Sequence, residues 1–121
     1  MRSQRVIKVQ KLAREVLGEL IQNLKDPRVG FVTVTAVRVT ADLRHARVLV
    51  SVLGSASDQE STMAGLRSAT PVLRTEMGHE MRMKYTPELV FELDTRTDEA
   101  LRVEELLNRI HQDRDAGEEP E

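Results

Sequence analysis

The sequence contains no cysteine and no tryptophan, and its only aromatic residues are Phe31, Tyr85 and Phe91. Without cysteine the chain has no disulfide, no thiol nucleophile and no cysteine-based metal site. No apolar run reaches the roughly 18 to 20 residues that a membrane-spanning helix needs. The basic, amphipathic start lacks the continuous apolar segment of a secretory signal. These absences predict a protein of the cytoplasm, where thiols stay reduced, with no association with membranes.

The sequence also lacks the motifs that carry common chemistry. It has no phosphate-binding Gly-x-x-x-x-Gly-Lys-Ser/Thr loop, and Met83 stands where a helical zinc motif starting at His79-Glu80 would need its second histidine. The three histidines fall in three different predicted elements. Asp42 and Asp94 fall at predicted turns, where aspartate commonly bonds the local backbone. We therefore predict no enzyme, no metal, no cofactor and no small-molecule substrate.

Charge is present in both signs but is unevenly distributed. The formal net charge is −2. Residues 1–50 hold ten Lys and Arg against four acids (+6), residues 51–97 five against seven (−2), and residues 98–121 three against nine (−6). A basic first half and an acidic end predict an anionic partner for the first half, although charge runs are often only solvated faces.

Residues 4–24 have the pattern of an amphipathic helix, because apolar residues recur at spacings of three and four. Cations recur every three residues along the other side of this helix. They form a basic stripe of Arg2, Arg5, Lys8, Lys11 and Arg14. Pro27 is expected to end the helix, with Asp26 displaced from helical geometry before it.

Two strands are predicted next, over residues 30–40 and 45–53, where β-branched residues alternate with polar ones. The short polar loop between them predicts an antiparallel hairpin. The apolar phase of the first strand shifts after Ala36, which predicts a β-bulge there.

A pair of helices should follow over residues 57–78. Ser57 and Glu60 match a capping box at the start. Pro71 cannot continue a helix smoothly, so we expect a kink at which Thr70 caps a second helical piece that Gly78 closes.

The remaining elements are a strand over residues 80–94 and a last helix beginning at Thr97-Asp98. All three aromatic residues fall in strand alternations and are expected in the core, which leaves no platform for stacking bases. We expect residues 1–112 to form one domain and the acidic residues 113–121 to be a disordered tail. The fold class is α+β, in the order α-β-β-α(kink)α-β-α, with helices on one face of a three-stranded sheet.

This order resembles a KH domain of the second topological type, and three local stretches resemble the bacterial ribosome-binding factor A family. The first runs from Lys25-Asp26-Pro27-Arg28 through Thr35, the second over residues 46–54, and the third over residues 87–94. The resemblance extends over roughly residues 4 to 110.

The resemblance implies an assembly factor rather than an enzyme. Members of the family bind the free 30S subunit through 16S rRNA, assist late maturation and 5′-end processing of that rRNA, and matter for growth in the cold. We expect a cytoplasmic protein with a monomer as the default oligomeric state, and whether an assembly GTPase is a further partner stays open. The Gly-x-x-Gly loop of other KH domains is missing from the family and from this chain. The family's Ala-x-Gly kink is here Ala69-Thr70-Pro71, which puts contact of RNA with the kink in doubt.

The Lys25–Arg28 turn is expected to hold two cations beside the basic stripe, at the same end of the domain, with Asp26 and Pro27 as turn residues and Ala69, Thr70 and Pro71 as kink residues. We predict RNA contacts by the cations Arg2, Arg5, Lys8, Lys11, Lys25, Arg28, Arg44, Arg47, Arg67, Arg74, Arg82 and Lys84. Two alternatives remain: a general KH-type RNA-binding module, and a protein–protein adaptor.

Overall fold

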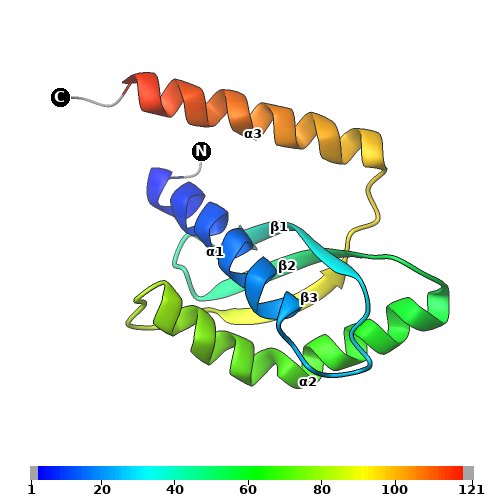
Figure 1. Ribbon diagram of the computed structural model, residues 1–121. Helices are drawn as coiled ribbons and strands as arrows, with labels where there is room; N and C mark the ends of the chain where they lie inside the picture. Colours follow the sequence, from blue (N-terminus) through cyan, green and yellow to red (C-terminus); the bar gives the residue numbers. More distant parts are fainter. Residues whose placement is uncertain (1–2, 119–121) are drawn as a thin grey trace.

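The computed structural model describes residues 3–118 and has two helices packed on one face of a three-stranded sheet, with a third helix beside them (Figure 1). The elements, in chain order, are α1 (Gln4–Gln22), β1 (Val32–Val39), β2 (His45–Val52), α2 (Ala56–Glu80), β3 (Glu88–Leu93) and α3 (Asp98–Glu118). This is the predicted α+β class in the predicted order. In the part of the chain that the structure describes, no helix is long and apolar enough to cross a membrane.

The sheet has the order β1-β2-β3, with β2 in the centre. β1 and β2 form the predicted antiparallel hairpin, and β3 lies parallel to β2. The register shifts between Val34 and Ala36, which is the predicted bulge. The extra residue, Thr35, lets Val37 and Val39 continue on the helix-facing side after the bulge.

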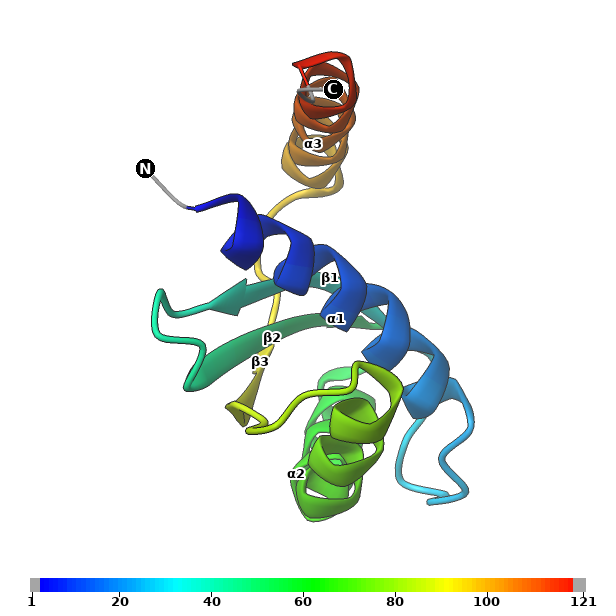
Figure 2. The same cartoon turned by 90° about the vertical axis from the view of Figure 1, so that its left-hand side faces the viewer.

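The core lies between this sheet and the two helices. α1 presents Ala13, Leu17 and Ile21 to the sheet, as its apolar spacing predicts. β2 supplies alternate residues, among them Val48 and Val50, which are completely buried. α1 and α2 cover the same face of the sheet (Figure 2).

α2 differs from the prediction in its bounds and continuity. The helix begins after Ser55, whose side chain forms the capping box with Asp58, rather than at Ser57. It then runs as one element through Pro71 to Glu80, so Thr70 is not a cap: its hydroxyl donates to the carbonyl of Leu66 within the helix. α2 nevertheless bends near its middle (Figure 1). A bend is the expected response to a proline that lacks a donor and crowds the preceding turn.

The strand predicted over residues 80–94 is shorter than expected. Residues 81–87 form a loop after α2, and only Glu88–Leu93 pair with the sheet. The alternation of Met81, Met83 and Tyr85 was therefore misleading. A period of two in a loop of seven residues is indistinguishable from a strand until its backbone partners are known.

α3 lies apart from the helix-covered face, beside the β1 edge of the sheet (Figure 2). Its predicted apolar residues Val103, Leu106, Leu107 and Ile110 are about half exposed, between 47% and 58%. Among the residues of α3 whose burial is described, none belongs to the buried core. The helix also continues to Glu118, so residues 113–118, predicted as a disordered tail, are helical; residues 119–121 lie outside the described residues.

Candidate nucleic-acid interface

A groove of about 830 Å³ opens at the end of the domain where α1 begins. Three segments that are distant in the sequence form its walls: the first half of α1, the β1–β2 loop and the loop after α2. Each wall contributes cations from the predicted set. We call this surface the basic groove; its cations are Arg5, Lys8, Arg44, Arg82 and Lys84. Its one carboxylate is Asp42.

The β1–β2 loop is held by hydrogen bonds from its own side chains. The Thr40 hydroxyl donates to Asp42 Oδ1 over 2.6 Å, and the Arg44 backbone N–H donates to the same oxygen over 3.1 Å. These bonds, that from Thr40 first, lower the pKa of Asp42 from its ordinary value. These hydrogen bonds fix the loop backbone, so the backbone of Arg44 has a defined position at the groove.

The loop after α2 is held by the end of the helix and by one arginine. The N–H of Met83 donates to the carbonyl of Gly78 over 2.9 Å, and Arg82 adopts a left-handed backbone with φ of 52°. The guanidinium of Arg74 donates to the carbonyls of Thr86 and Pro87, each over 3.0 Å. Arg74, predicted to contact RNA, therefore ties α2 to the start of β3.

Several arginines outside the groove are neutralised by ion pairs, whereas the groove cations, in the part of the chain that the structure describes, are not. Arg28, Arg47 and Arg96 each lie within 2.7 Å of a carboxylate oxygen. Among the side chains that the structure describes, no groove cation is held in an ion pair; Lys84 instead lies over the ring of Tyr85, 5.7 Å from its centroid. The basic groove thus brings together five cations that no described carboxylate pairs with.

The Lys25–Arg28 turn lies at the other end of α1 from the basic groove. A helix of 19 residues is roughly 28 Å long. Asp26 holds the turn as predicted, by accepting the Arg28 backbone N–H over 2.9 Å. Asp26 also binds the guanidinium of Arg28 over 2.7 Å, and this side-chain hydrogen bond lowers the pKa of Asp26. The expectation that Lys25 and Arg28 share one end with the basic stripe is wrong.

Three further predicted cations, among the residues that the structure describes, lie outside the groove. Lys11 lines a second cavity, of about 500 Å³, between α1, β1 and α3, whose lining has three acids beside three cations: Glu15, Glu19 and Glu105, and Lys11, Arg14 and Arg109. Arg47 pairs with Glu92 on the sheet face that α1 and α2 leave uncovered. Arg67 is exposed on α2. Arg2 lies outside the described residues.

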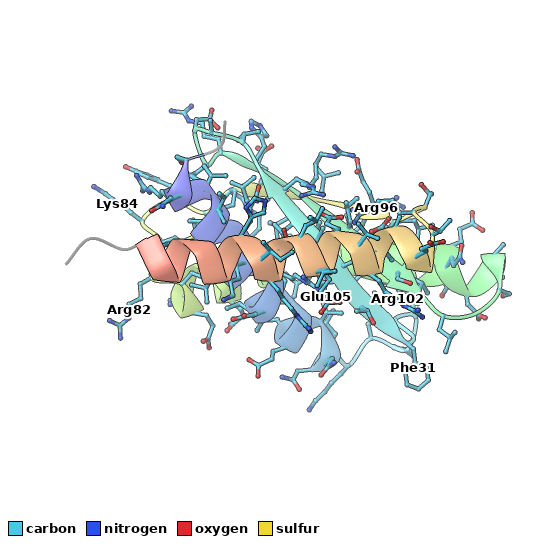
Figure 3. The ribbon with its side chains drawn as sticks, turned by 90° about the horizontal axis from the view of Figure 1, so that it is seen from above. Phe31, Arg82, Lys84, Arg96, Arg102 and Glu105 are labelled. Carbon is cyan, nitrogen blue, oxygen red and sulfur yellow. The ribbon has the colours of Figure 1, made fainter. Side chains whose placement is uncertain are left out.

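Two of the three aromatic residues are not in the core, contrary to the prediction. Phe91 is buried at 3% exposure, whereas Phe31 and Tyr85 are each 79% exposed. Phe31 precedes β1 and Tyr85 lies in the loop that lines the basic groove. Figure 3 shows Phe31 at one end of the domain and Arg82 and Lys84 at the other. A sequence signal for this was missed: Tyr85 closely follows Arg82 and Lys84, and an aromatic residue near two cations is typical of a nucleic-acid-binding surface.

Asp94 was considered as a candidate acid or base, but its side chain is bound by neighbouring residues and serves the structure. Its side chain is only 2% exposed and accepts from the Thr35 hydroxyl over 2.6 Å and from Arg96 over 2.7 Å. The Arg96 guanidinium, and secondarily Thr35, hold the pKa of Asp94 far below its ordinary value. A carboxylate with so low a pKa is a weak base and stays ionised near neutral pH, so it is poorly suited to acid–base catalysis.

Fold and groove together define the class of this protein: a small KH-like domain of the second topological type with a cationic surface at one end. The model of the family described as ribosome-binding factor A matches residues 5–107. The chain therefore belongs to the ribosome-binding factor A family.

Curated and solved relatives agree with this assignment. A ribosome-binding factor A of Geotalea uraniireducens is 43% identical over 104 residues, 85% of each chain. The solution structure of a putative ribosome-binding factor A of Thermotoga maritima is 30% identical, with a TM-score of 0.70 over 81% of this chain and 94% of that one. A third relative is a homology model of the Thermus thermophilus ribosome-binding factor A, fitted into a cryo-EM map of a 30S complex. It is 30% identical, with a TM-score of 0.60 over 69% of this chain and 88% of that one.

Proposed function

We propose that this protein is an assembly factor that binds the free small ribosomal subunit, with the basic groove on phosphates of folded 16S rRNA. The carrying observation is the groove itself, in which five cations from three segments face one locally bonded carboxylate. Family membership supports the choice of partner, because a relative of this fold is described in a complex with the 30S particle.

The way in which the cations are held supports recognition of backbone shape. Arg44, Arg82 and Lys84 stand on loops fixed by hydrogen bonds, and Arg5 and Lys8 stand one helical turn apart on α1. Cations at fixed separations can match the phosphate spacing of a folded RNA, whereas mobile ones would bind any polyanion. Contacts of this kind release counterions, so affinity should fall as salt rises.

The first experiment is co-sedimentation of the full chain with free small subunits, large subunits and whole ribosomes over a salt series. We expect retention on small subunits alone, lost as salt rises. The double variant Arg82→Glu/Lys84→Glu should weaken retention by at least about 10-fold and flatten the salt dependence by roughly one unit of slope for each phosphate that the variant no longer binds.

Arg67→Glu is a control for the effect of charge reversal as such, because it reverses one exposed charge outside the groove. It should bind within about twofold of the wild type. Retention of the wild type on all particles alike, or an Arg67→Glu defect equal to that of the groove variant, would contradict the proposed mode of binding.

The rest of the proposed role follows the family resemblance. We propose that binding assists late maturation and 5′-end processing of 16S rRNA in the cytoplasm, supports growth in the cold, and involves no catalysis by this chain. Residues 1–112 would carry the binding, as a monomer.

A protein–protein adaptor is the second candidate, and α3 is the observation that favours it. Glu104, Glu105 and Asn108 face the body of the domain, so the half-exposed Val103, Leu106 and Ile110 are directed away from it. An exposed apolar stripe can receive a protein partner. Retention that is indifferent to salt would favour this function over contact with phosphates.

A further inference from the structure

Tyr85 is exposed in an unusual place for a large aromatic side chain. The residue is 79% exposed, and it is one of only three aromatic residues in the chain. It stands among the cations of the basic groove, in the loop whose backbone is held by α2 and by Arg74. A ring presented by a fixed loop costs little conformational entropy when a ligand packs on it.

The surroundings of the ring leave a face of it available. The Nζ of Lys84 lies over the ring, 5.7 Å from its centroid, which is cation–π geometry. Apolar parts of Val9, Leu12 and Met83 line the same groove beside the charged side chains. The groove therefore offers cations for phosphates and an apolar aromatic surface at the same place.

Phosphate contacts alone do not account for an exposed aromatic ring in this position. Stacking of an unpaired base on an aromatic side chain is the usual way in which proteins combine a ring with a basic groove. Bases within a duplex are already stacked on each other and are not accessible to Tyr85. The ligand that matches both features is a nucleotide with its base outside a helix and its phosphate within reach of Arg82 or Lys84.

We infer that Tyr85 stacks on an unpaired base of the bound RNA, so that the basic groove holds a single-stranded or bulged nucleotide and not only a duplex backbone. The inference rests on the proposed function, and it specifies which feature of the rRNA the groove selects. RNA is favoured over a protein partner because the cations around the ring are unneutralised.

The first test measures equilibrium binding of three variants to purified small subunits. Tyr85→Ala should bind about 10-fold more weakly, since stacking on one base is worth that order of affinity. Tyr85→Phe keeps the ring and should bind like the wild type. Phe31→Ala is the matched control, because Phe31 is equally exposed but lies at the opposite end of the domain (Figure 3).

The second test reports stacking directly. The chain has no tryptophan, so Tyr85→Trp introduces a single one that can be excited where RNA is transparent. Protein-free 16S rRNA should quench its emission, while inorganic polyphosphate, which has phosphates and no bases, should leave it nearly unchanged. Phe31→Trp carries the same probe outside the groove and should respond to neither.

The outcomes separate this inference from the proposed function. If the wild type is not retained on small subunits, both fail. If the wild type binds and Tyr85→Ala binds equally well, or polyphosphate quenches as strongly as rRNA, stacking is overturned and the proposed function stands. Quenching by intact subunits but not by protein-free rRNA would assign Tyr85 to a ribosomal protein and would also overturn the inference.

Discussion

Asp94 joins three parts of the chain, two through its buried carboxylate and one through its backbone N–H. It accepts from Thr35 on the β1 bulge and from the guanidinium of Arg96 on the segment that leads to α3, and its own N–H donates to the carbonyl of Val50 on β2. Arg96 in turn contacts Glu104, which also binds Arg38. The carboxylate therefore fixes the exit of β3 against the sheet.

Replacing this carboxylate should destabilise the fold in a pH-dependent way. Asp94→Asn removes the charge that Arg96 and Thr35 bind, which should lower the free energy of unfolding by about 2 kcal/mol at neutral pH. Because folding lowers the pKa of Asp94, its contribution is complete above the unfolded value of about 3.9 and is lost as the pH falls below it. Urea denaturation at several pH values measures the effect.

The control for this prediction is Glu60→Gln, which neutralises one exposed carboxylate on α2. It should leave the free energy of unfolding within about 0.5 kcal/mol of the wild type. A stability difference between wild type and Asp94→Asn that grows as the pH falls from 7 to 3 would contradict the assigned role of the ionised form.

At the scale of elements, α2 owes its position to a close approach of the Lys25–Arg28 turn. A Cβ added at Gly65 would lie 2.7 Å from Cγ2 of Val29. The Thr62 hydroxyl donates to the carbonyl of Arg28 and accepts from the N–H of Gly30, so the segment after the turn is bonded to the helix. Gly65 begins the stretch Gly65-Leu66-Arg67-Ser68, which lacks the second glycine of a Gly-x-x-Gly loop. This glycine therefore serves the packing of α2 against Val29.

Two glycine-to-alanine substitutions should have opposite effects. Gly65→Ala should lower the free energy of unfolding by about 1 to 3 kcal/mol, because its methyl group displaces Val29. Gly18→Ala should raise it by up to about 1 kcal/mol, because alanine favours helix and nothing lies within 4 Å of the added Cβ on α1. Thermal unfolding of both variants tests the pair; equal effects would show that the Val29 side chain can relax without cost.

The elements best predicted from sequence were those whose pattern and packing agree. The apolar spacing of α1 and the phase shift at Ala36 both reflect burial against one core, so periodicity was sufficient. α2 was predicted less well, because Ser55-Asp58 and Ser57-Glu60 both match a capping box and only the backbone selects the first. Pro71 was expected to interrupt a helix that in fact continues, which is an instance of tertiary context overriding local preference.

The candidate site could be predicted only in its composition. Sequence identified the cations, but the groove joins residues 5 and 8 to residues 44, 82 and 84, and only the tertiary fold brings these positions together. The same limit applies to Arg74, whose carbonyl partners lie 12 and 13 residues later. It also applies to Tyr85, because a loop with alternating residues has the same pattern as a strand with a buried face.

At the scale of the whole molecule, charge and stability are carried by different parts of the chain. The buried core is formed by residues from α1, α2 and the sheet, and no described residue of α3 belongs to it. α3 reaches the body through Glu104, which contacts Arg38 and Arg96. Residues 98–121 hold nine acids and three cations, so removing them would change the net charge from −2 to −2 − (−6) = +4. The acidic end therefore opposes the attraction of RNA to the basic groove, and among the described side chains its support of the fold is limited to the Glu104 ion pairs.

A chain ending at residue 97 should test this division. It should unfold cooperatively with a melting temperature within a few degrees of the full chain, because no core residue is removed. It should also bind 16S rRNA severalfold more tightly at low salt, and the gain should disappear at high salt, where charges beyond a Debye length are screened. Filter binding over a salt series measures both affinities. A gain that persists at high salt would mean that α3 physically covers part of the RNA-binding surface, and a loss of affinity at all salts would mean that α3 itself contacts the RNA.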